Sequence, residues 1–324
     1  MMTNLSKELH EKFLAELRMR ISERGKLANF LMDVLFIEKE AVYRRLRGEV
    51  PFSFAEVAVL AKKLHISVDN IFDITSTFRS FSFRLYGYNF FNMTEVDYDI
   101  SRQYLSIIRA ALNDPESEFG FAASIVPLHF STRYRHIFRL YMLRWMYQFG
   151  NPGITPSYEQ IAIPQKLQEY HDEYLKEIEN IKQTYFIWDE FLMYYITNDV
   201  KYFRNIQLMT DKDVANIKNE LSLFLDDLEV LAHRGTYDSG NQVELYVSNI
   251  NFEATYTYLY SANIHLSMIT TFSLSAATSL EKEACENIRI WIQSLKRTST
   301  MISTSAEIDR AMFFAKQREF LARI

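Results

Sequence analysis

The spacing of the apolar residues changes near residue 80, and this change constrains the fold more than any other feature of the chain. Before it, apolar residues recur every three or four positions, as they do on one face of a helix. After it, runs that alternate apolar and polar residues lie among long helical patterns. The spacing therefore predicts a multi-domain protein, with an all-α domain over residues 1–78 and an α+β domain over residues 79–324.

Five short helices are expected in the first domain. The first two are separated by Gly25, and the third ends at Gly48, which stands where a C-cap glycine is common. Pro51 then prevents extension, and the sequence "SFAE" at residues 53–56 is a capping box that opens the fourth helix. Ser67 caps a short fifth helix. The expected helical stretches are 7–21, 26–36, 38–47, 53–64 and 67–72.

The third of these helices carries three arginines in four residues, "RRLR". On a helical wheel Val42 and Leu46 define its buried side, and Glu40, Arg44 and Arg47 lie on the opposite side. A short helix after a tight turn, with basic and polar residues facing outward, is what insertion into a DNA major groove requires. The residues predicted to contact DNA are Lys39, Glu40, Tyr43, Arg44, Arg45 and Arg47.

The stretch from Leu31 to about Phe72 resembles the helix-turn-helix domain of the Cro and lambda-repressor (XRE-like) class of transcriptional regulators, and the resemblance covers about residues 8–75. It implies a five-helix head whose third helix reads double-stranded DNA. The residues that match the core and turn positions of that class are Leu31, Leu35, Ile37, Val42, Gly48, Pro51, Leu60, Ala61, Leu64 and Ile71.

Three residues depart from that pattern. Met32 stands where a small alanine is usual, Phe36 where the turn usually has a glycine, and Arg45 where an apolar residue is common. Arg45 either faces DNA or lies with its stem over the domain. Two other interpretations of the head remain: a charged helix that is only a solvated face, and a helix-turn-helix fold used for protein contact, as in an adaptor that does not bind DNA.

The second domain is expected to contain an antiparallel meander. Three runs alternate in polarity, at residues 243–247, 252–260 and 264–276, and short turns at 249–251 and 261–263 separate them. Two further strands are predicted within residues 80–88 and 119–126. The helices predicted to flank the sheet are 132–149, 164–182, 211–233, 280–296 and 305–322.

The side chains of the meander divide into an aromatic and a polar set. Tyr256, Tyr258, Tyr260 and Phe272 are expected on one face, where they form core or, with helical aromatics Tyr141, Trp145 and Tyr147, line a pocket for a small apolar or planar effector. The other face is expected to be solvent-exposed or a subunit contact, and it carries His265, Ser267, Thr271, Ser273 and Ser275. A homodimer is expected, through that face or through an apolar stripe on the last helix made of Ile308, Met312, Phe313 and Phe320.

Little in the chain predicts catalysis or a cofactor. No glycine-rich phosphate loop, HExxH or GxSxG motif occurs, and the single cysteine, Cys285, is expected to be a small packed residue. His129 and His136 are seven apart, but packed or surface histidines are more common than a two-histidine metal site. His171, in "HDEY", is expected to be solvated on a charged helix.

The charge of the chain bears on its partners. The net charge is −5, which argues against non-specific coating of nucleic acid or membranes, but the first 80 residues carry 13 basic and 11 acidic side chains. The first residues lack a long apolar segment, so no secretory signal is expected, and the only long uncharged stretch alternates in polarity. The sequence thus predicts a cytoplasmic, non-enzymatic, sequence-specific transcriptional regulator that binds a DNA operator.

Overall fold

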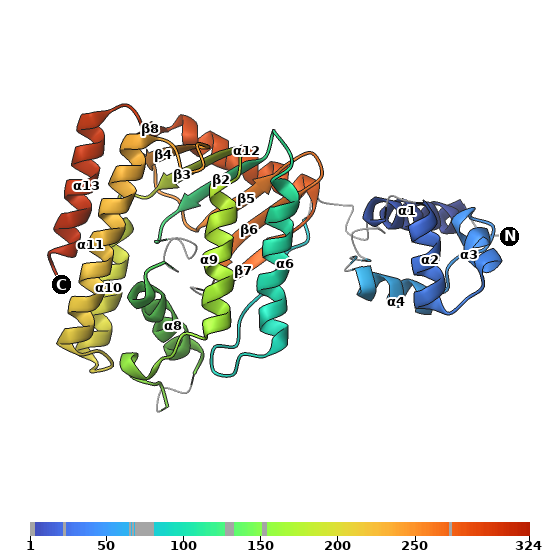
Figure 1. Ribbon diagram of the computed structural model, residues 1–324, viewed down its shortest axis with the longest axis horizontal. Helices are drawn as coiled ribbons and strands as arrows, with labels where there is room; N and C mark the ends of the chain where they lie inside the picture. The colour runs from blue at the N-terminus through green and yellow to red at the C-terminus, as the bar shows by residue number, and fades with distance from the viewer. Residues whose placement is uncertain are drawn as a thin grey trace. The chain divides into compact units, whose positions relative to one another are not determined.

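The computed structural model describes residues 4–21, 24–64, 66, 68, 81–126, 133–150, 154–271 and 274–324. The chain divides into two compact units, Met1–Ser80 and Phe81–Ile324, which are called the head and the larger unit below. The head is helical, and the larger unit combines a mixed sheet with flanking helices (Figure 1). The predicted fold class, an all-α domain followed by an α+β domain, is therefore confirmed.

Four helices of the head lie in the described residues: α1 (Asn4–Arg20), α2 (Arg24–Leu35), α3 (Lys39–Leu46) and α4 (Phe54–Leu64). The predicted helix break at Gly25 is wrong, because α1 already ends at Arg20 and Gly25 lies in the first turn of α2. A glycine costs less at a helix end than in its interior, since the first turn lacks part of the hydrogen-bond ladder. Of the predicted fifth helix, only Val68 lies in the described residues, where it is helical.

The head has its own hydrophobic core, to which all four helices contribute. Of the core positions named from the sequence, Leu31, Val42, Leu60 and Ala61 are buried. Three others, Leu35, Ile37 and Leu64, are half-buried and pack against the same core, whereas Ile71 lies outside the described residues. The buried members of this core are Phe13, Leu14, Leu17, Leu27, Ala28, Leu31, Val42, Leu46, Phe52, Leu60, Ala61 and Ile66.

The sheet of the larger unit has eight strands in the order β1-β7-β6-β5-β2-β3-β4-β8 among the described residues. Its middle strands β2, β3 and β4 are parallel, and the other pairings are antiparallel. The strands are β1 (Arg84–Tyr86), β2 (Glu118–Ala123), β3 (Gln183–Trp188), β4 (Gln242–Ser248), β5 (Tyr256–Tyr260), β6 (His265–Thr271), β7 (Ser275–Ser279) and β8 (Ser299–Met301).

A meander is present, but it is not made of the three predicted runs. It consists of β5, β6 and β7, because the run at 264–276 supplies β6 and the start of β7. The run at 243–247 forms β4, which pairs with β3 and β8 and not with β5. The sequence pattern missed β3 because a strand buried on both faces, such as "TYFIW", does not alternate in polarity.

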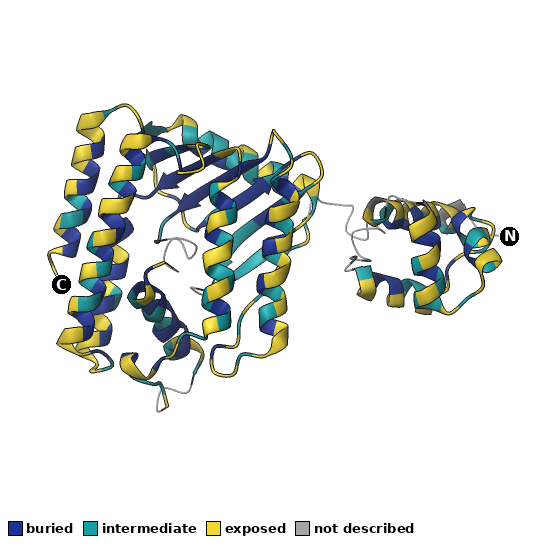
Figure 2. Ribbon diagram, in the orientation of Figure 1, coloured by how far each residue is buried: buried dark blue, intermediate teal, exposed yellow. Residues whose placement is uncertain are grey.

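Helices cover both faces of the sheet (Figures 1 and 2). Helix α12 packs on one face, and α6 and α9 pair with each other on the opposite one, while α10, α11 and α13 form a group beyond β4. Helices α6 and α10 were not predicted. The helices of the larger unit are α6 (Glu95–Ala111), α8 (Arg135–Phe149), α9 (Gln165–Glu179), α10 (Leu192–Asn205), α11 (Asp211–Arg234), α12 (Lys282–Arg297), α13 (Glu307–Leu321) and the short 3₁₀ helix η1 (Tyr158–Gln160).

The strand register corrects the predicted division of the meander into aromatic and polar faces. Tyr258 is paired with Ser267, and Tyr260 with His265, so the tyrosines and the polar residues of β6 share one face. Helix α12 covers that face, and Ser267 is fully buried while Ser275 is 7% exposed. The polar side chains are therefore not a solvent face. Phe272 and Ser273 lie outside the described residues.

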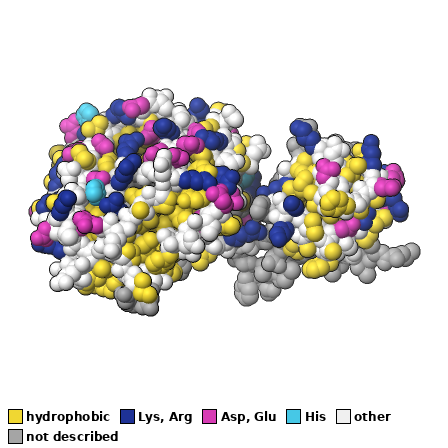
Figure 3. All heavy atoms as spheres, turned by 60° about the horizontal axis from the view of Figure 1, so that its bottom comes forward, with side chains coloured by type: hydrophobic (Ala, Val, Ile, Leu, Met, Phe, Trp, Pro, Cys, Tyr) yellow, Lys and Arg dark blue, Asp and Glu magenta, His cyan; other side chains and the backbone are white. Residues whose placement is uncertain are grey.

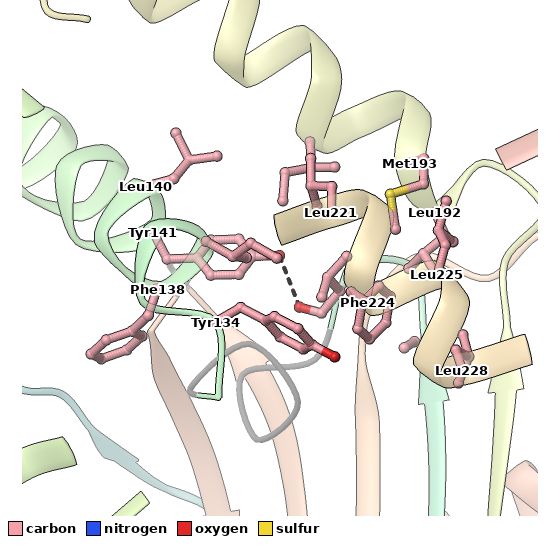
Figure 4. Close-up of a cluster of buried hydrophobic side chains, with 14 of the residues drawn as sticks. Tyr134, Phe138, Leu140, Tyr141, Leu192, Met193, Leu221, Phe224, Leu225 and Leu228 are labelled. Atoms are coloured by element: carbon pink, nitrogen blue, oxygen red, sulfur yellow. Dashed lines mark hydrogen bonds between the residues drawn. The ribbon is translucent and has the colours of Figure 1, made fainter. Parts of the chain in front are cut away.

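The apolar stripe predicted on the last helix is divided between the core and the surface. Phe313 and Phe320 are buried in α13, whereas Ile308 and Met312 are 76% and 67% exposed. The buried residues belong to the main core, to which α8, α10 and α11 also contribute (Figure 4). Only two of the four stripe residues are therefore available for contact with another chain.

Candidate nucleic-acid interface

Helix α3 presents one side to the head's core and the other to solvent. Val42 and Leu46, the two residues predicted to be buried, have 0% and 4% of their surface exposed. Lys39, Arg44 and Arg47 are exposed on the outer side, together with Glu40. The sequence pattern thus oriented this helix correctly, and its outer side carries four of the six predicted contact residues.

The C-terminal end of α3 is held in place by contacts to its last carbonyl groups. Arg18 of α1 donates to the Leu46 carbonyl at 3.0 Å, and His10 hydrogen-bonds the Arg45 carbonyl at 3.2 Å. Gly48 follows with φ +76°, the left-handed conformation that glycine adopts without strain, and the Glu49 N–H donates to the Arg44 carbonyl at 2.9 Å. These contacts satisfy carbonyls that a helix end otherwise leaves open, so the orientation of α3 is well defined.

A capping box opens α4, and its glutamate also bonds Arg45 of α3. The Ser53 N–H donates to Glu56 at 2.7 Å, and the Glu56 N–H donates to the Ser53 hydroxyl at 3.3 Å, as the sequence predicted. The same carboxylate accepts two hydrogen bonds from the Arg45 guanidinium, at 2.8 and 3.3 Å. Burial by itself raises the pKa of Glu56, but the Ser53 and Arg45 bonds outweigh it and hold the pKa below its usual value.

Arg45 is thereby occupied within the head. Its side chain is only 17% exposed, and it also donates to the Ala41 carbonyl at 3.2 Å. Of the two alternatives that the sequence left open for Arg45, the described structure has the one in which the side chain lies over the domain. Tyr43, another predicted contact residue, is half-buried and packs against the head's core.

Arg44 and Arg47 are exposed but paired with glutamates of the same surface. Arg47 donates to Glu49 at 2.6 Å and to Glu40 at 3.1 Å, and Arg44 lies 3.7 Å from Glu49. The hydrogen bond from Arg47 holds the pKa of Glu49 below its usual value. Four basic and four acidic side chains occur between residues 38 and 56, so this surface has no net charge.

Two phenylalanines next to α3 point into solvent. Phe36, in the turn between α2 and α3, is 92% exposed, and Phe54, at the start of α4, is 86% exposed. Phe36 has φ 55°, so an aromatic residue adopts the left-handed conformation for which glycine is common in this class of turn. On the face of the head seen in Figure 3, hydrophobic, basic and acidic side chains are mixed.

Sites outside the head were also predicted, and the structure tests several of them. Cys285 is fully buried, as expected, and burial raises its pKa to about 12. His136 hydrogen-bonds the Tyr158 hydroxyl at 2.9 Å, and His129 lies outside the described residues, in which no cluster of metal-binding side chains is found. The prediction that His171 is solvated is wrong, because its Nδ1 is buried without a hydrogen-bond partner.

The comparisons with known proteins fit the helical head, because the family whose model matches it is one of helix-turn-helix-type DNA-binding domains. The family model that matches is the BetR domain, over residues 9–78. No curated protein and no solved structure matched the chain. No helix in the described residues is long and apolar enough to cross a membrane.

Proposed function

We propose that the protein is a sequence-specific transcriptional regulator whose α3 reads a double-stranded DNA operator of the kind that Cro- and lambda-repressor-class proteins bind. The observation that carries this proposal is the outer side of α3, where Arg44 and Arg47 project from a helix that is fixed at its C-terminal end. Arginines on a rigid helix can pair with guanine edges or grip phosphates. Arg45 instead positions α3 by bonding Glu56.

The test is selection of genomic fragments by the purified full chain, followed by a salt titration of the fragments it binds. A regulator of this kind loses affinity steeply as salt rises, because its cations release counterions from the DNA. Binding must also exceed that to random duplex. Equal affinity for selected and random duplex contradicts sequence-specific reading.

A protein-interaction adaptor is the second candidate, and the exposed Phe36 and Phe54 favour it. Exposed aromatic side chains that lie close in sequence to a charge-neutral surface are more typical of protein contacts than of contacts to phosphates. An adaptor shows no salt-dependent affinity for any duplex. The same salt titration therefore separates the two candidates.

The larger unit is proposed to dimerise the regulator, to sense a ligand, or to do both. One helix-turn-helix head reads only a few base pairs, and two-fold symmetry places two heads about 34 Å apart on one side of the duplex. Ile308 and Met312 are the exposed apolar residues of α13 that suit such an interface. Light scattering tests the dimer: a full chain that is monomeric at micromolar concentration contradicts it. If the chain is a dimer, the double variant Ile308→Glu, Met312→Glu should be monomeric, and this result would support the α13 surface.

A further inference from the structure

A cavity of about 120 Å³ lies between the sheet and helices α6, α8 and α9 of the larger unit. It lies on the sheet face opposite α12. The aromatic pocket considered from the sequence was expected on the other face, which carries Tyr256, Tyr258 and Tyr260. Of the aromatic residues named from the sequence as pocket candidates, only Tyr141 lines it. Its walls are notable for six tyrosines: Tyr86, Tyr88, Tyr104, Tyr141, Tyr170 and Tyr174.

The strand register explains the floor of this cavity. Tyr86 of β1 pairs with Ala276 of β7, and Ala276 pairs with Thr270 of β6, so these three side chains project to the same side. Ala276 is the smallest of them, and its small side chain leaves space between larger neighbours. The pairing of three strands therefore shapes the floor of the cavity, while Tyr88, Ile125, Val126 and Leu274, which lie between helices and strands, complete its lining.

The chemistry of the lining restricts what the cavity can hold. None of the residues that line it is Asp, Glu, Lys or Arg. His171 is its one side chain that titrates near neutral pH, and burial lowers its pKa to about 4, so the ring is neutral at pH 7. A charged ligand would lose its hydration without gaining a counter-charge, which excludes ions and favours a neutral molecule.

Two polar atoms of the lining are buried without a hydrogen-bond partner: Thr255 Oγ1 and His171 Nδ1. Thr255 has only 4% of its surface exposed. By contrast, Tyr88 bonds Ser101 at 3.0 Å, and Tyr141 donates to the Val126 carbonyl at 2.8 Å (Figure 4). Buried polar groups are nearly always paired, so an unpaired ring nitrogen and an unpaired hydroxyl in one cavity point to a ligand that supplies the missing bonds.

We propose that this cavity binds a small, neutral, single-ring aromatic molecule with a hydroxyl group, of the phenol class. Its ring packs among the tyrosines, and its hydroxyl bonds His171 or Thr255. The volume of about 120 Å³ limits the ligand to a single ring, because an apolar cavity of about 150 Å³ is known to hold benzene. The role of the molecule as an effector rests on the proposed regulatory function, whereas its binding does not.

Calorimetric titration of the full chain, without DNA, tests the binding with phenol, toluene and benzoate as probes. Phenol and toluene are expected to bind saturably with one molecule per chain, and benzoate is not, because it is an anion. Ala276→Leu fills the cavity and should abolish binding. Ala277→Leu, which adds the same group on the other face of β7, should leave it unchanged. Absent binding of phenol, or binding that survives in Ala276→Leu, overturns the proposal.

Two further variants test the hydroxyl and remain informative if Ala276→Leu does not fold. His171→Phe keeps a ring and removes the acceptor, and Thr255→Val keeps the shape and removes the hydroxyl. One of them should weaken phenol binding about 5-fold, the factor that one neutral hydrogen bond supplies, and leave toluene binding unchanged. Unchanged phenol affinity in both overturns the phenol class. DNA binding is measured separately, so an unchanged chain that binds DNA but not phenol contradicts the ligand proposal and leaves the proposed function standing.

Discussion

Arg47 in the head and Arg289 in the larger unit each place a guanidinium nitrogen 2.6 Å from a glutamate oxygen, yet their surroundings differ. In the head, the side chains of Arg47 and Glu49 are 44% and 48% exposed. In the larger unit, the Glu118 side chain is 10% exposed and that of Arg289 is 37% exposed, and Glu118 also accepts bonds from the Tyr185 and Tyr258 hydroxyls and from Gln293.

The comparison shows that the distance between two charges does not decide their contribution to stability. Water screens the exposed pair of the head, so its partners can be exchanged for others at little cost. Removing the buried Glu118 leaves Arg289 and the neighbouring donors without their acceptor in a less polar environment. Arg44 and Arg47 can therefore exchange their glutamate partners for other groups at little cost, whereas the pair in the larger unit is structural.

The largest expected effect is on the buried pair. Glu118→Ala should lower the free energy of unfolding of the larger unit by about 3 kcal/mol, since two tyrosine hydroxyls and the partly exposed Arg289 lose a shared acceptor. All three tryptophans, Trp145, Trp188 and Trp291, lie in this unit, so fluorescence during urea unfolding follows it alone.

The control for that measurement is an exposed pair in the same unit. Glu173 lies 3.0 Å from Arg109, and both side chains are about half exposed. Glu173→Ala should therefore leave the urea midpoint nearly unchanged. Equal destabilisation by the two variants would remove the distinction between buried and exposed pairs.

The next effect concerns DNA affinity. Arg44→Ala or Arg47→Ala should weaken binding to selected DNA about tenfold or more if the side chain contacts a base, without lowering thermal stability. Arg20→Ala is the matched control, because Arg20 is an arginine of α1 paired with Glu16 at 3.0 Å. If both α3 variants bind as the unchanged protein does, α3 is not the reading helix.

A smaller effect is expected where a pair in the head is partly buried. Glu56→Gln should destabilise a fragment of residues 1–80 by about 1 kcal/mol, because it weakens the capping box and removes the charge that holds Arg45. The folded-state pKa of Glu56 is below its usual 4.5, so its carboxylate stabilises the head above that pH, and the contribution is lost as the pH falls through the folded pKa.

Circular dichroism melting of the fragment between pH 3 and pH 7 measures this. The difference between the fragment and its Glu56→Gln variant should be constant near neutral pH and shrink well below pH 4.5. Glu11→Gln, on the exposed side of α1, is the control and should change neither the melting temperature of the fragment nor its pH dependence. A pH-independent difference would mean that the Glu56 charge contributes nothing.

The smallest expected change in stability accompanies Glu49→Gln. The substitution frees Arg44 and Arg47 from an exposed partner, so the melting temperature should hardly change. DNA affinity should rise by about two- to fivefold at low salt, because one acidic group beside the arginines is gone. Glu11→Gln changes the net charge equally; if it strengthens binding as much, the effect is one of total charge and not of the pairing.

Local pattern alone predicted most of the head. The positions of α3 and α4, the capping box at Ser53 and the turn at Gly48 depend on contacts between residues close in the chain, and such contacts leave a readable signature. The pairing of Arg45 with Glu56 did not follow from the pattern. Both residues are charged, and only the crossing of α3 and α4 brings them together.

In the larger unit, local pattern predicted less of the structure. The alternating runs were found, but their pairing was not, because β3 is buried on both faces and its apolar run gives no period of two. His171 was placed in solvent on account of its charged neighbours. Its spacing from Leu167, Leu175 and Ile178, all buried in α9, is helical and would have placed it on the inner side.

The sequence by itself determined the two-domain division of the fold, the amphipathic helices of the head and the outward direction of Arg44 and Arg47. These follow from periodicity and from capping residues, which act over a few positions along the chain. Only the tertiary structure decided the strand order, the network around Glu118 and the tyrosine-lined cavity. Each of these joins residues separated by many tens of positions, and long-range pairing has no local signature because any strand of suitable polarity can pair with several others.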